Sequence, residues 1–290
     1  MKNRLAFAVG AMLVVGMMTG CAGKTEPAAT TAAVDTTAAS DTTAAADTAA
    51  AADMTAAAEN PFSGKTVKVG CSATFVPFES IEMAADGSKT YVGMNIDIIK
   101  AIVEKNGGQV EFTDMPFKSL MAAIQAGQID FCSGGMAPTE EREKTLDFSD
   151  IFFYPRNAIV YRAGEEYPTL DSLKGKKIAY VFGTNYQQVA ESVEGAETVG
   201  IQGSPACIEE VKSKRVDACI IDGAGATEFL KNNDTLAMSL LDKTDDCFAI
   251  GFPKESPYYE TFNNTLKEMM ENGELNEIVK THLNEQFILD

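Results

Sequence analysis

The most informative stretch of the sequence is Ser133-Gly134-Gly135-Met136-Ala137-Pro138-Thr139-Glu140-Glu141-Arg142. It follows the strand-like run 129–132, so the two glycines are predicted to form a turn where a strand ends. Glycine leaves the backbone N–H groups of such a turn open to a ligand. The planar guanidinium of Arg142 can hold a carboxylate through two parallel hydrogen bonds. The stretch therefore predicts an anion-binding turn, and the alternative is a plain turn followed by a solvated arginine.

Strand-like and helix-like segments alternate on both sides of this stretch. The predicted strands are 66–71, 110–112, 129–132, 177–182 and 216–221, with extended runs at 157–162 and 246–252. The predicted helices are 94–105, 117–126, 185–193, 207–214, 257–270 and 274–284. Such alternation is typical of an α/β protein whose sheets are largely parallel. Two such units joined by two extended connections predict two lobes with a ligand between them.

Polar residues follow three of the predicted strands, at the points where those strands end. Ser72 follows one, Ser133 follows another, and Asp222 follows a third. Ligands of parallel sheets bind at the carboxyl ends of the strands, so we expect these three residues to meet in the cleft.

The first sixty residues do not have the pattern of a folded domain. Residues 1–20 combine a basic start with a short apolar run, and the Gly20-Cys21 pair that ends it predicts a lipoprotein signal peptide and lipidation at Cys21. A plain signal peptide or an uncleaved anchor is the alternative. Residues 21–60, rich in Ala, Thr and Asp, bury too little apolar surface to fold and are predicted to be a flexible tether.

Composition narrows the class of protein. A chain of 290 residues is long enough for one or two domains, and its net charge of −18 argues against nucleic acid and anionic membrane surfaces as partners of the folded part. After Cys21, five cysteines remain, an odd number without metal-ligand spacing, and His282 is the only histidine. We expect mostly free thiols, no metal and no cofactor.

The segment 136–150 resembles the ligand loop of the bacterial extracellular solute-binding proteins of family 3, the receptors of amino acid ABC importers. Gly93-Met94-Asn95-Ile96-Asp97 is similar to a second signature of that family, with departures at Met94 and Asn95, and the resemblance extends across residues 66–284. It implies a two-lobed type II periplasmic-binding fold with two crossing hinge strands. Lobe 1 would comprise 61–158 and 251–290, and lobe 2 would comprise 159–250.

The resemblance also implies roles for individual residues. In the family, the residues matching Thr139 and Arg142 hold the α-carboxylate of the ligand, and the residue matching Asp222 holds its ammonium group. A helix N-cap is the alternative role of Asp222, and core packing is the alternative for the aromatic pair that would enclose the ligand side chain. The implied ligand-binding residues are Ser72, Phe75, Phe117, Ser133, Gly135, Ala137, Arg142, Thr184, Asn185 and Asp222.

The function implied by the resemblance is that of a receptor, and no enzymatic activity is expected. It would capture a polar or neutral L-amino acid, deliver it to an ABC permease and ATPase complex, and act as a monomer anchored by lipid to the outer face of the cytoplasmic membrane. The neutral Ser72 and the apolar Val181 favour an uncharged side chain, although Lys118 or Glu79 could reach the pocket. The alternatives are a cyclohexadienyl-dehydratase-like enzyme, with Glu79 as its acid, and a sensory lipoprotein.

Overall fold

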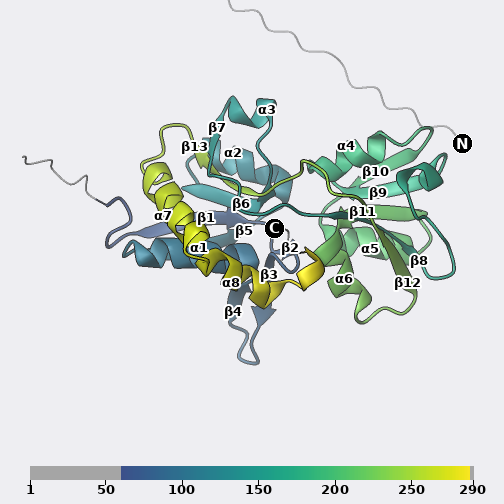
Figure 1. Ribbon diagram of the computed structural model, residues 1–290, viewed down its shortest axis with the longest axis horizontal. Helices are drawn as coiled ribbons and strands as arrows, with labels where there is room; N and C mark the ends of the chain where they lie inside the picture. Colours follow the sequence, from purple (N-terminus) through teal and green to yellow (C-terminus); the bar gives the residue numbers. More distant parts are fainter. Residues whose placement is uncertain (1–59, 288–290) are drawn as a thin grey trace, which may run out of the picture. The chain divides into compact units, whose positions relative to one another are not determined.

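A computed structural model describes residues 60–287 of the chain (Figure 1). The predicted signal peptide, Cys21 and residues 22–59 of the predicted tether lie outside the described residues. No helix within 60–287 combines the length and the apolar character that crossing a bilayer requires.

The first sheet has five strands in the order β5-β1-β6-β13-β7. These are β1 (Thr66–Cys71), β5 (Gln109–Asp114), β6 (Phe131–Met136), β7 (Leu146–Phe148) and β13 (Ala249–Pro253). β1 pairs in parallel with β5 and β6, whereas β13 runs antiparallel to β6 and β7. We call this sheet and the helices packed on it lobe 1.

The second sheet also has five strands, in the order β10-β9-β11-β8-β12. These are β8 (Asn157–Arg162), β9 (Lys177–Val181), β10 (Glu197–Ile201), β11 (Ala218–Asp222) and β12 (Leu236–Leu240). β10, β9 and β11 are parallel, and β8 is antiparallel to β11 and β12. We call this sheet and its helices lobe 2. The predicted lobe boundaries, at 158 and 250, fall inside β8 and β13.

Helices cover both sheets because the strands are apolar on both faces. The helices are α1 (Met94–Lys105), α2 (Leu120–Gln125), α3 (Glu140–Glu143), α4 (Asn185–Glu191), α5 (Ser204–Lys212), α6 (Gly223–Leu230), α7 (Tyr259–Glu271) and α8 (Glu274–His282), with the short 3-10 turns η1 (Phe117–Ser119), η2 (Leu170–Leu173) and η3 (Glu285–Phe287). Along β6, Phe131 packs in the cluster formed with α1, α7 and α8, and the next residue, Cys132, packs in the cluster formed with α2. In lobe 2, α4 and α5 both pack against β9 and β11.

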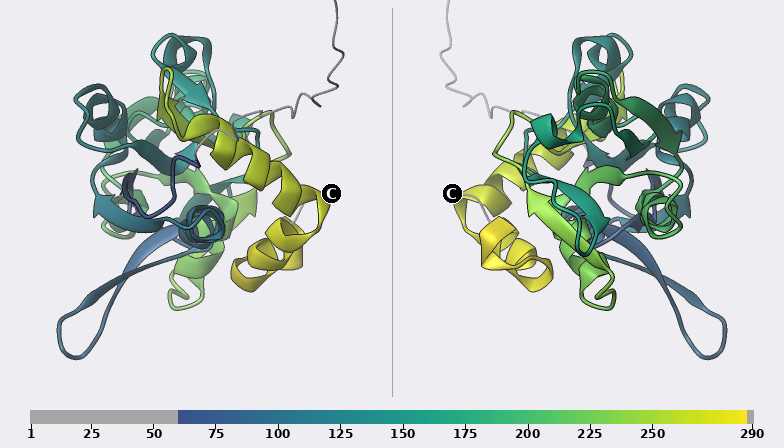
Figure 2. Two further views of the ribbon diagram at one scale, coloured as in Figure 1. Left: turned by 90° about the vertical axis from the view of Figure 1, so that its left-hand side faces the viewer. Right: turned by 90° about the vertical axis from the view of Figure 1, so that its right-hand side faces the viewer.

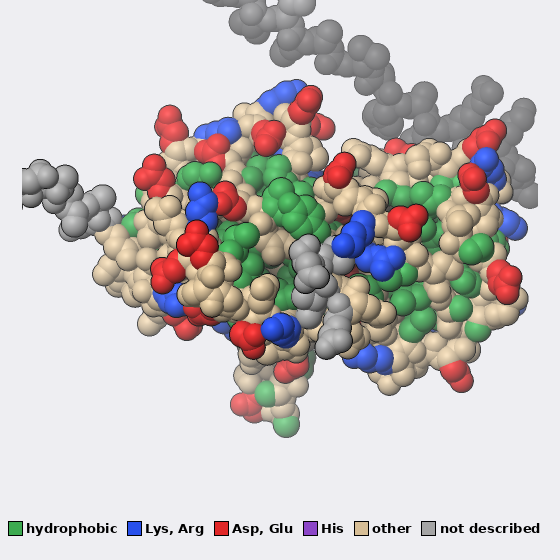
Figure 3. All heavy atoms as spheres, viewed as in Figure 1, with side chains coloured by type: hydrophobic (Ala, Val, Ile, Leu, Met, Phe, Trp, Pro, Cys, Tyr) green, Lys and Arg blue, Asp and Glu red, His purple; other side chains and the backbone are tan. Residues whose placement is uncertain are grey.

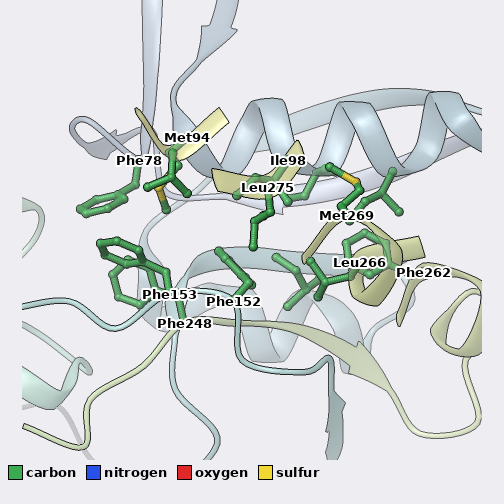
Figure 4. Packing of buried hydrophobic residues seen from close by; sticks show 14 of the residues in the cluster. Phe78, Met94, Ile98, Phe152, Phe153, Phe248, Phe262, Leu266, Met269 and Leu275 are labelled. Carbon is green, nitrogen blue, oxygen red and sulfur yellow. The ribbon is translucent and has the colours of Figure 1, made fainter. Parts of the chain in front are cut away.

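The chain crosses between the two sheets twice, through 149–156 and 241–248. Phe153 and Phe248 form an antiparallel bridge between these two crossing segments. Their rings lie against Phe78, with Phe248 edge-on to Phe78 at 5.1 Å between ring centroids (Figure 4). The two connections are thus joined to each other by backbone pairing and by a small aromatic cluster.

The glycine stretch is a strand and not a turn, so that prediction is wrong. β6 continues through Gly134 and Gly135, which adopt φ values of +119° and +63°. A Cβ on Gly135 would lie 2.5 Å from Cε1 of Phe75. The glycines therefore let the strand continue along a close contact with a neighbouring ring.

The segment after β1 also differs from its prediction. Between the predicted strand 66–71 and the predicted helix 94–105, where no strand was expected, the chain forms a three-stranded antiparallel sheet of β2 (Thr74–Phe75), β3 (Glu79–Met83) and β4 (Lys89–Val92). The β3–β4 hairpin extends away from the first sheet (Figure 2). The parallel character is also weaker than predicted, because each five-stranded sheet includes antiparallel pairs.

The cysteine prediction is confirmed for the described residues, where Cys71, Cys132, Cys207, Cys219 and Cys247 are free and buried. Charged side chains of both signs are interspersed over the face shown in Figure 3. That distribution fits a solvated exterior, as expected for a chain of high net charge.

Candidate ligand-binding site

A pocket lies between the two lobes, with an empty volume of about 470 Å³ that includes the open solvent at its mouth. It is lined by Ser72, Thr74, Phe75, Phe117, Gly134, Gly135 and Arg142 from lobe 1, by Val181, Thr184, Asn185, Tyr186, Gly203 and Ser204 from lobe 2, and by Asp246 from a crossing segment. Ser72, Phe75, Phe117, Gly135, Arg142, Thr184 and Asn185 were singled out from the sequence, and all of them line this pocket.

Arg142 is fixed at the pocket by contacts to both lobes. Its Nη1 donates to the carbonyl oxygen of Ala137 at 2.8 Å, and its Nη2 donates across the cleft to the carbonyl oxygen of Gly183 at 3.1 Å. Its guanidinium lies 5.5 Å from the centroid of the Phe117 ring. Burial lowers the pKa of Arg142 below its ordinary value. A guanidinium held in this way loses little freedom when it takes a carboxylate.

Thr139 positions Arg142 through the backbone. Its hydroxyl oxygen accepts a hydrogen bond from the Arg142 N–H at 3.3 Å and so caps the short helix α3. Thr139 lines a neighbouring cavity, and Ala137 is buried and offers its carbonyl to Arg142. Neither side chain lines the pocket between the lobes, within the part of the chain that is described.

Glu79 lies behind the lobe 1 wall of the pocket and is fully buried. Its carboxylate accepts hydrogen bonds from the Ser72 N–H at 2.7 Å, the Gly134 N–H at 2.6 Å and Asn95 Nδ2 at 2.9 Å, and from the Ser133 hydroxyl. Three of these four partners can only donate, which indicates an ionised carboxylate. Burial raises the pKa of Glu79, and the four hydrogen bonds oppose that rise. Glu79 thus joins the end of β1 to the glycine segment of β6.

These contacts show that two residues expected at the pocket, Ser133 and Glu79, do not line it. Ser133 does not line the pocket, because its buried hydroxyl is turned to Glu79. Glu79 does not reach the pocket either, since all of its surface is covered. The sequence singled out Glu79 as a residue that could reach the pocket, but no motif indicated that it would hold the strand ends together.

The start of α4 forms the lobe 2 wall opposite Arg142. Thr184 is the N-cap residue, and its hydroxyl donates to the carbonyl of Val181 at 2.6 Å. Asn185 donates through Nδ2 to Oδ1 of Asp246 at 2.6 Å. Burial raises the pKa of Asp246, whereas the bonds from Asn185 and the Cys247 N–H and the charge of Arg142 oppose the rise.

Asp222 ends β11 and is 2 % exposed, and it does not line the pocket. It caps α6, since Oδ1 accepts from the Gly225 N–H at 2.9 Å. Oδ2 is buried without a hydrogen-bond partner among the described residues. Burial raises the pKa of Asp222 to about 7. In the structure Asp222 therefore acts as the N-cap of α6, which was its alternative role. Its second carboxylate oxygen, Oδ2, still lacks a hydrogen-bond partner among the described residues.

Tyr186 and Asp246 were missed by sequence reasoning, although both line the pocket. Burial raises the pKa of the Tyr186 phenol well above 10, and the charges of Asp222 and Asp246 raise it further. Asp246 lies in a crossing segment that has no motif, so its sequence neighbourhood gives no signal. Gly203 and Ser204 open α5 after β10 and could have been found as a second strand-to-helix junction.

A second cavity adjoins the pocket at its rim. Its lining includes Asp114 and Lys118, one charge of each sign, and the Lys118 ammonium lies 5.4 Å from the centroid of the Phe182 ring in lobe 2. Within residues 60–287, no group of His, Cys, Asp and Glu side chains is arranged to hold a metal ion. The residues that line the pocket offer hydrogen bonding and charge pairing through their side chains and backbone.

Comparisons with known proteins agree with this architecture. The family model of bacterial extracellular solute-binding proteins, family 3, matches residues 67–285. The arginine-binding extracellular protein ArtP of Bacillus subtilis (strain 168) is 33% identical over 222 residues, which cover 74% of this chain and 85% of that protein.

Solved structures of amino-acid-binding proteins are also similar to this chain. An ancestral arginine-binding protein bound to arginine has a TM-score of 0.69 and 34% identity, covering 76% of this chain and 98% of that one. The ancestral amino-acid-binding protein AncCDT-1, a precursor of cyclohexadienyl dehydratase, has a TM-score of 0.67 and 27% identity, covering 76% and 96%. The predicted α/β, two-lobed type II fold is confirmed, and the chain belongs to the bacterial extracellular solute-binding proteins of family 3.

Proposed function

We propose that this protein is the receptor of an ABC importer, which captures a free polar L-amino acid between its lobes and presents the closed form to a permease. The observation that carries the proposal is Arg142, a half-buried guanidinium held by both lobes in a pocket that both lobes line. In this proposal Arg142 pairs with the α-carboxylate, and the unpartnered Oδ2 of Asp222 turns to the ammonium group as the lobes close on the ligand.

Magnitudes support enclosure of the ligand by both lobes. Micromolar affinity requires about −8 kcal/mol. An amino acid has about ten heavy atoms, so each must contribute roughly −0.8 kcal/mol, which lies between the best small ligands and drug-sized ones. Burial on both sides with both charges paired is the arrangement that reaches such values. The closed form is then the state that a permease can distinguish from the empty receptor.

The enzymatic alternative finds less support in the site. Glu79, the acid that a dehydratase would have used, is sealed behind the pocket wall and held by four hydrogen bonds. AncCDT-1 is similar to this chain but is itself an amino-acid-binding protein. We expect no turnover when the protein is incubated with cyclohexadienyl substrates.

Anchoring and assembly complete the proposal. Lipidation at Cys21 with a flexible tether up to residue 60 would hold a monomeric receptor at the outer face of the membrane, within reach of a permease. The tether of roughly thirty to forty residues would span about 30 Å as a random coil.

Thermal unfolding in the presence of each common L-amino acid tests the receptor function. A ligand at a hundredfold excess over its Kd adds about 2.7 kcal/mol, which shifts the midpoint by several degrees in a domain of this size. Arg142→Ala should abolish the shift. Lys144→Ala, which removes an exposed positive charge two residues away, should preserve it. Absence of any shift after unfolding and refolding to remove a retained ligand would contradict the proposal.

A further inference from the structure

The charges at the pocket do not balance. Arg142 and Asp246 are the charged residues among those that line it. Asp222 lies behind the lining with Oδ2 unpartnered, and the charge of Asp246 acts on it. When both carboxyl groups are ionised, the described part of the site places one positive charge against two negative charges.

The surrounding charges do not restore the balance. At the rim, Asp114 and Lys118 contribute one charge of each sign. Glu79 is fully buried behind the lining residues, and its carboxylate is surrounded by its own four donors. The excess of one negative charge therefore belongs to Asp222 and Asp246.

Asp246 has a free acceptor for a ligand. Within residues 60–287, both hydrogen bonds that it accepts end on Oδ1, from Asn185 Nδ2 at 2.6 Å and from the Cys247 N–H at 3.0 Å. Oδ1 is therefore used to position the carboxylate, and Oδ2 remains for a cation. The contact with Asn185 also places the carboxylate at the lobe 2 wall of the pocket.

A zwitterionic ligand with a neutral side chain would satisfy only part of this site. Its carboxylate pairs with Arg142 and its ammonium pairs with one aspartate, which leaves the other carboxylate enclosed without a counter-charge. An enclosed and unpaired carboxylate is strongly unfavourable. A ligand with a second positive charge removes that penalty.

We propose that Asp246 is a specificity-determining residue that selects an L-amino acid with a cationic side chain, of the guanidinium or ammonium class, over its neutral isostere. The inference rests on the proposed receptor function and deepens it. It differs from the prediction of an uncharged side chain, which rested on Ser72 and Val181, because Asp246 lies far from both in sequence and faces the same pocket.

Calorimetric titration of the purified protein with L-arginine and L-citrulline tests the inference, because citrulline has the same shape without the charge. We expect arginine to bind about tenfold to a hundredfold more tightly, the range for one charge-assisted hydrogen bond. Asp246→Asn keeps Oδ1 as an acceptor and removes the charge, so the ratio of the two Kd values should fall toward one. Asp245→Asn removes the same charge at the exposed neighbouring residue and should leave the ratio unchanged.

Each result of these titrations either supports or overturns the assignment of Asp246 as a specificity-determining residue. Equal binding of arginine and citrulline by the native protein overturns the inference, whatever the variants do. A ratio that stays constant in Asp246→Asn while both ligands weaken assigns Asp246 to positioning Asn185 and also overturns it. Asp246→Ser serves as the second neutral variant if the first does not fold, judged by its thermal transition. Binding of glutamine without arginine would overturn only this inference, whereas binding of no amino acid would overturn the receptor function itself.

Discussion

Single residues determine how the site is built, and Glu79 is the clearest case. A buried carboxylate is unfavourable unless it is hydrogen-bonded, and Glu79 has four donors from three separate segments. Two of them, the N–H groups of Ser72 and Gly134, belong to residues that line the pocket. The hydrogen bonds that compensate for burying the Glu79 carboxylate therefore also hold the lobe 1 wall of the pocket in place.

Glu79→Gln should show this coupling. The amide nitrogen of glutamine would face N–H donors, so we expect a loss of about 2–3 kcal/mol in the free energy of unfolding. Ligand affinity should fall as well, because the Ser72 and Gly134 backbone would shift. Urea unfolding and calorimetric titration measure the two effects.

Glu82→Gln is the matched control, because Glu82 lies on the same strand, β3, and is exposed. It should change neither quantity by more than about 0.5 kcal/mol. A Glu79→Gln protein with native stability would show that the four hydrogen bonds do not need a charged acceptor.

Asp222 should make both stability and binding depend on pH. Its pKa of about 7 in the folded, empty protein lies above the ordinary value of 3.8, so the folded state holds a proton that unfolding releases. The contribution of Asp222 to stability is then full below pH 3.8 and is lost as the pH rises through about 7. The ligand ammonium group needs the ionised form, so affinity should change in the opposite direction.

We therefore expect the Kd to be about tenfold higher, and binding weaker, at pH 6 than at pH 8. The unfolding midpoint of the empty protein should decline over the same interval. Asp222→Asn should flatten that decline and weaken binding at both pH values. An affinity independent of pH would mean that Asp222 does not meet the ammonium group.

At the scale of elements, α6 shows how a helix in lobe 2 approaches lobe 1. A Cβ added to Gly225 would lie 2.7 Å from the carbonyl oxygen of Val76, in the loop after β2. Alanine there would favour the helix itself, since glycine is a weaker helix former by about 1 kcal/mol. The same methyl group would hold the two lobes apart.

Gly225→Ala should accordingly weaken binding by about fivefold to a hundredfold, which corresponds to about 1–3 kcal/mol of steric strain in the closed form. Stability of the empty protein should stay equal or rise. Ala226→Gly in the same helix should show the reverse pattern, with lower stability and an unchanged Kd. Calorimetric titration and thermal unfolding of both variants check this, and unchanged binding by Gly225→Ala would show that the lobes need not approach so closely.

Sequence reasoning succeeded for elements with strong apolar periodicity and failed for the edge strands of the second sheet. The interior strand β9 and the long helices α1 and α7 were found, because each has a continuous buried face. β10 and β12 are edge strands with few buried residues, so their patterns resemble those of loops. The glycines of β6 gave a turn signal that close packing against Phe75 overrode.

At the level of the whole molecule, the site depends on how the two lobes are placed against each other. That placement could not be predicted from the sequence. Residues that follow strands in one lobe, such as Ser72, were predictable from the rule that ligands bind at strand ends. Asp246 was not, because it enters the pocket from a crossing segment. Thr74 and Gly203 likewise become neighbours only across the cleft, where a Cβ on Gly203 would lie 2.7 Å from Oγ1 of Thr74.

The order of strands in the first sheet also has a consequence for synthesis on the ribosome. β13 lies between β6 and β7, so β7 lacks its neighbour until residues 249–253 have been translated. The second sheet uses only strands between residues 157 and 240, a continuous stretch that leaves the exit tunnel earlier. Since contiguous units can fold as they emerge, lobe 2 should be complete while lobe 1 still waits for its last strand. The nascent chain would then hold a finished lobe 2 and an open lobe 1 whose β6 edge is exposed to chaperones.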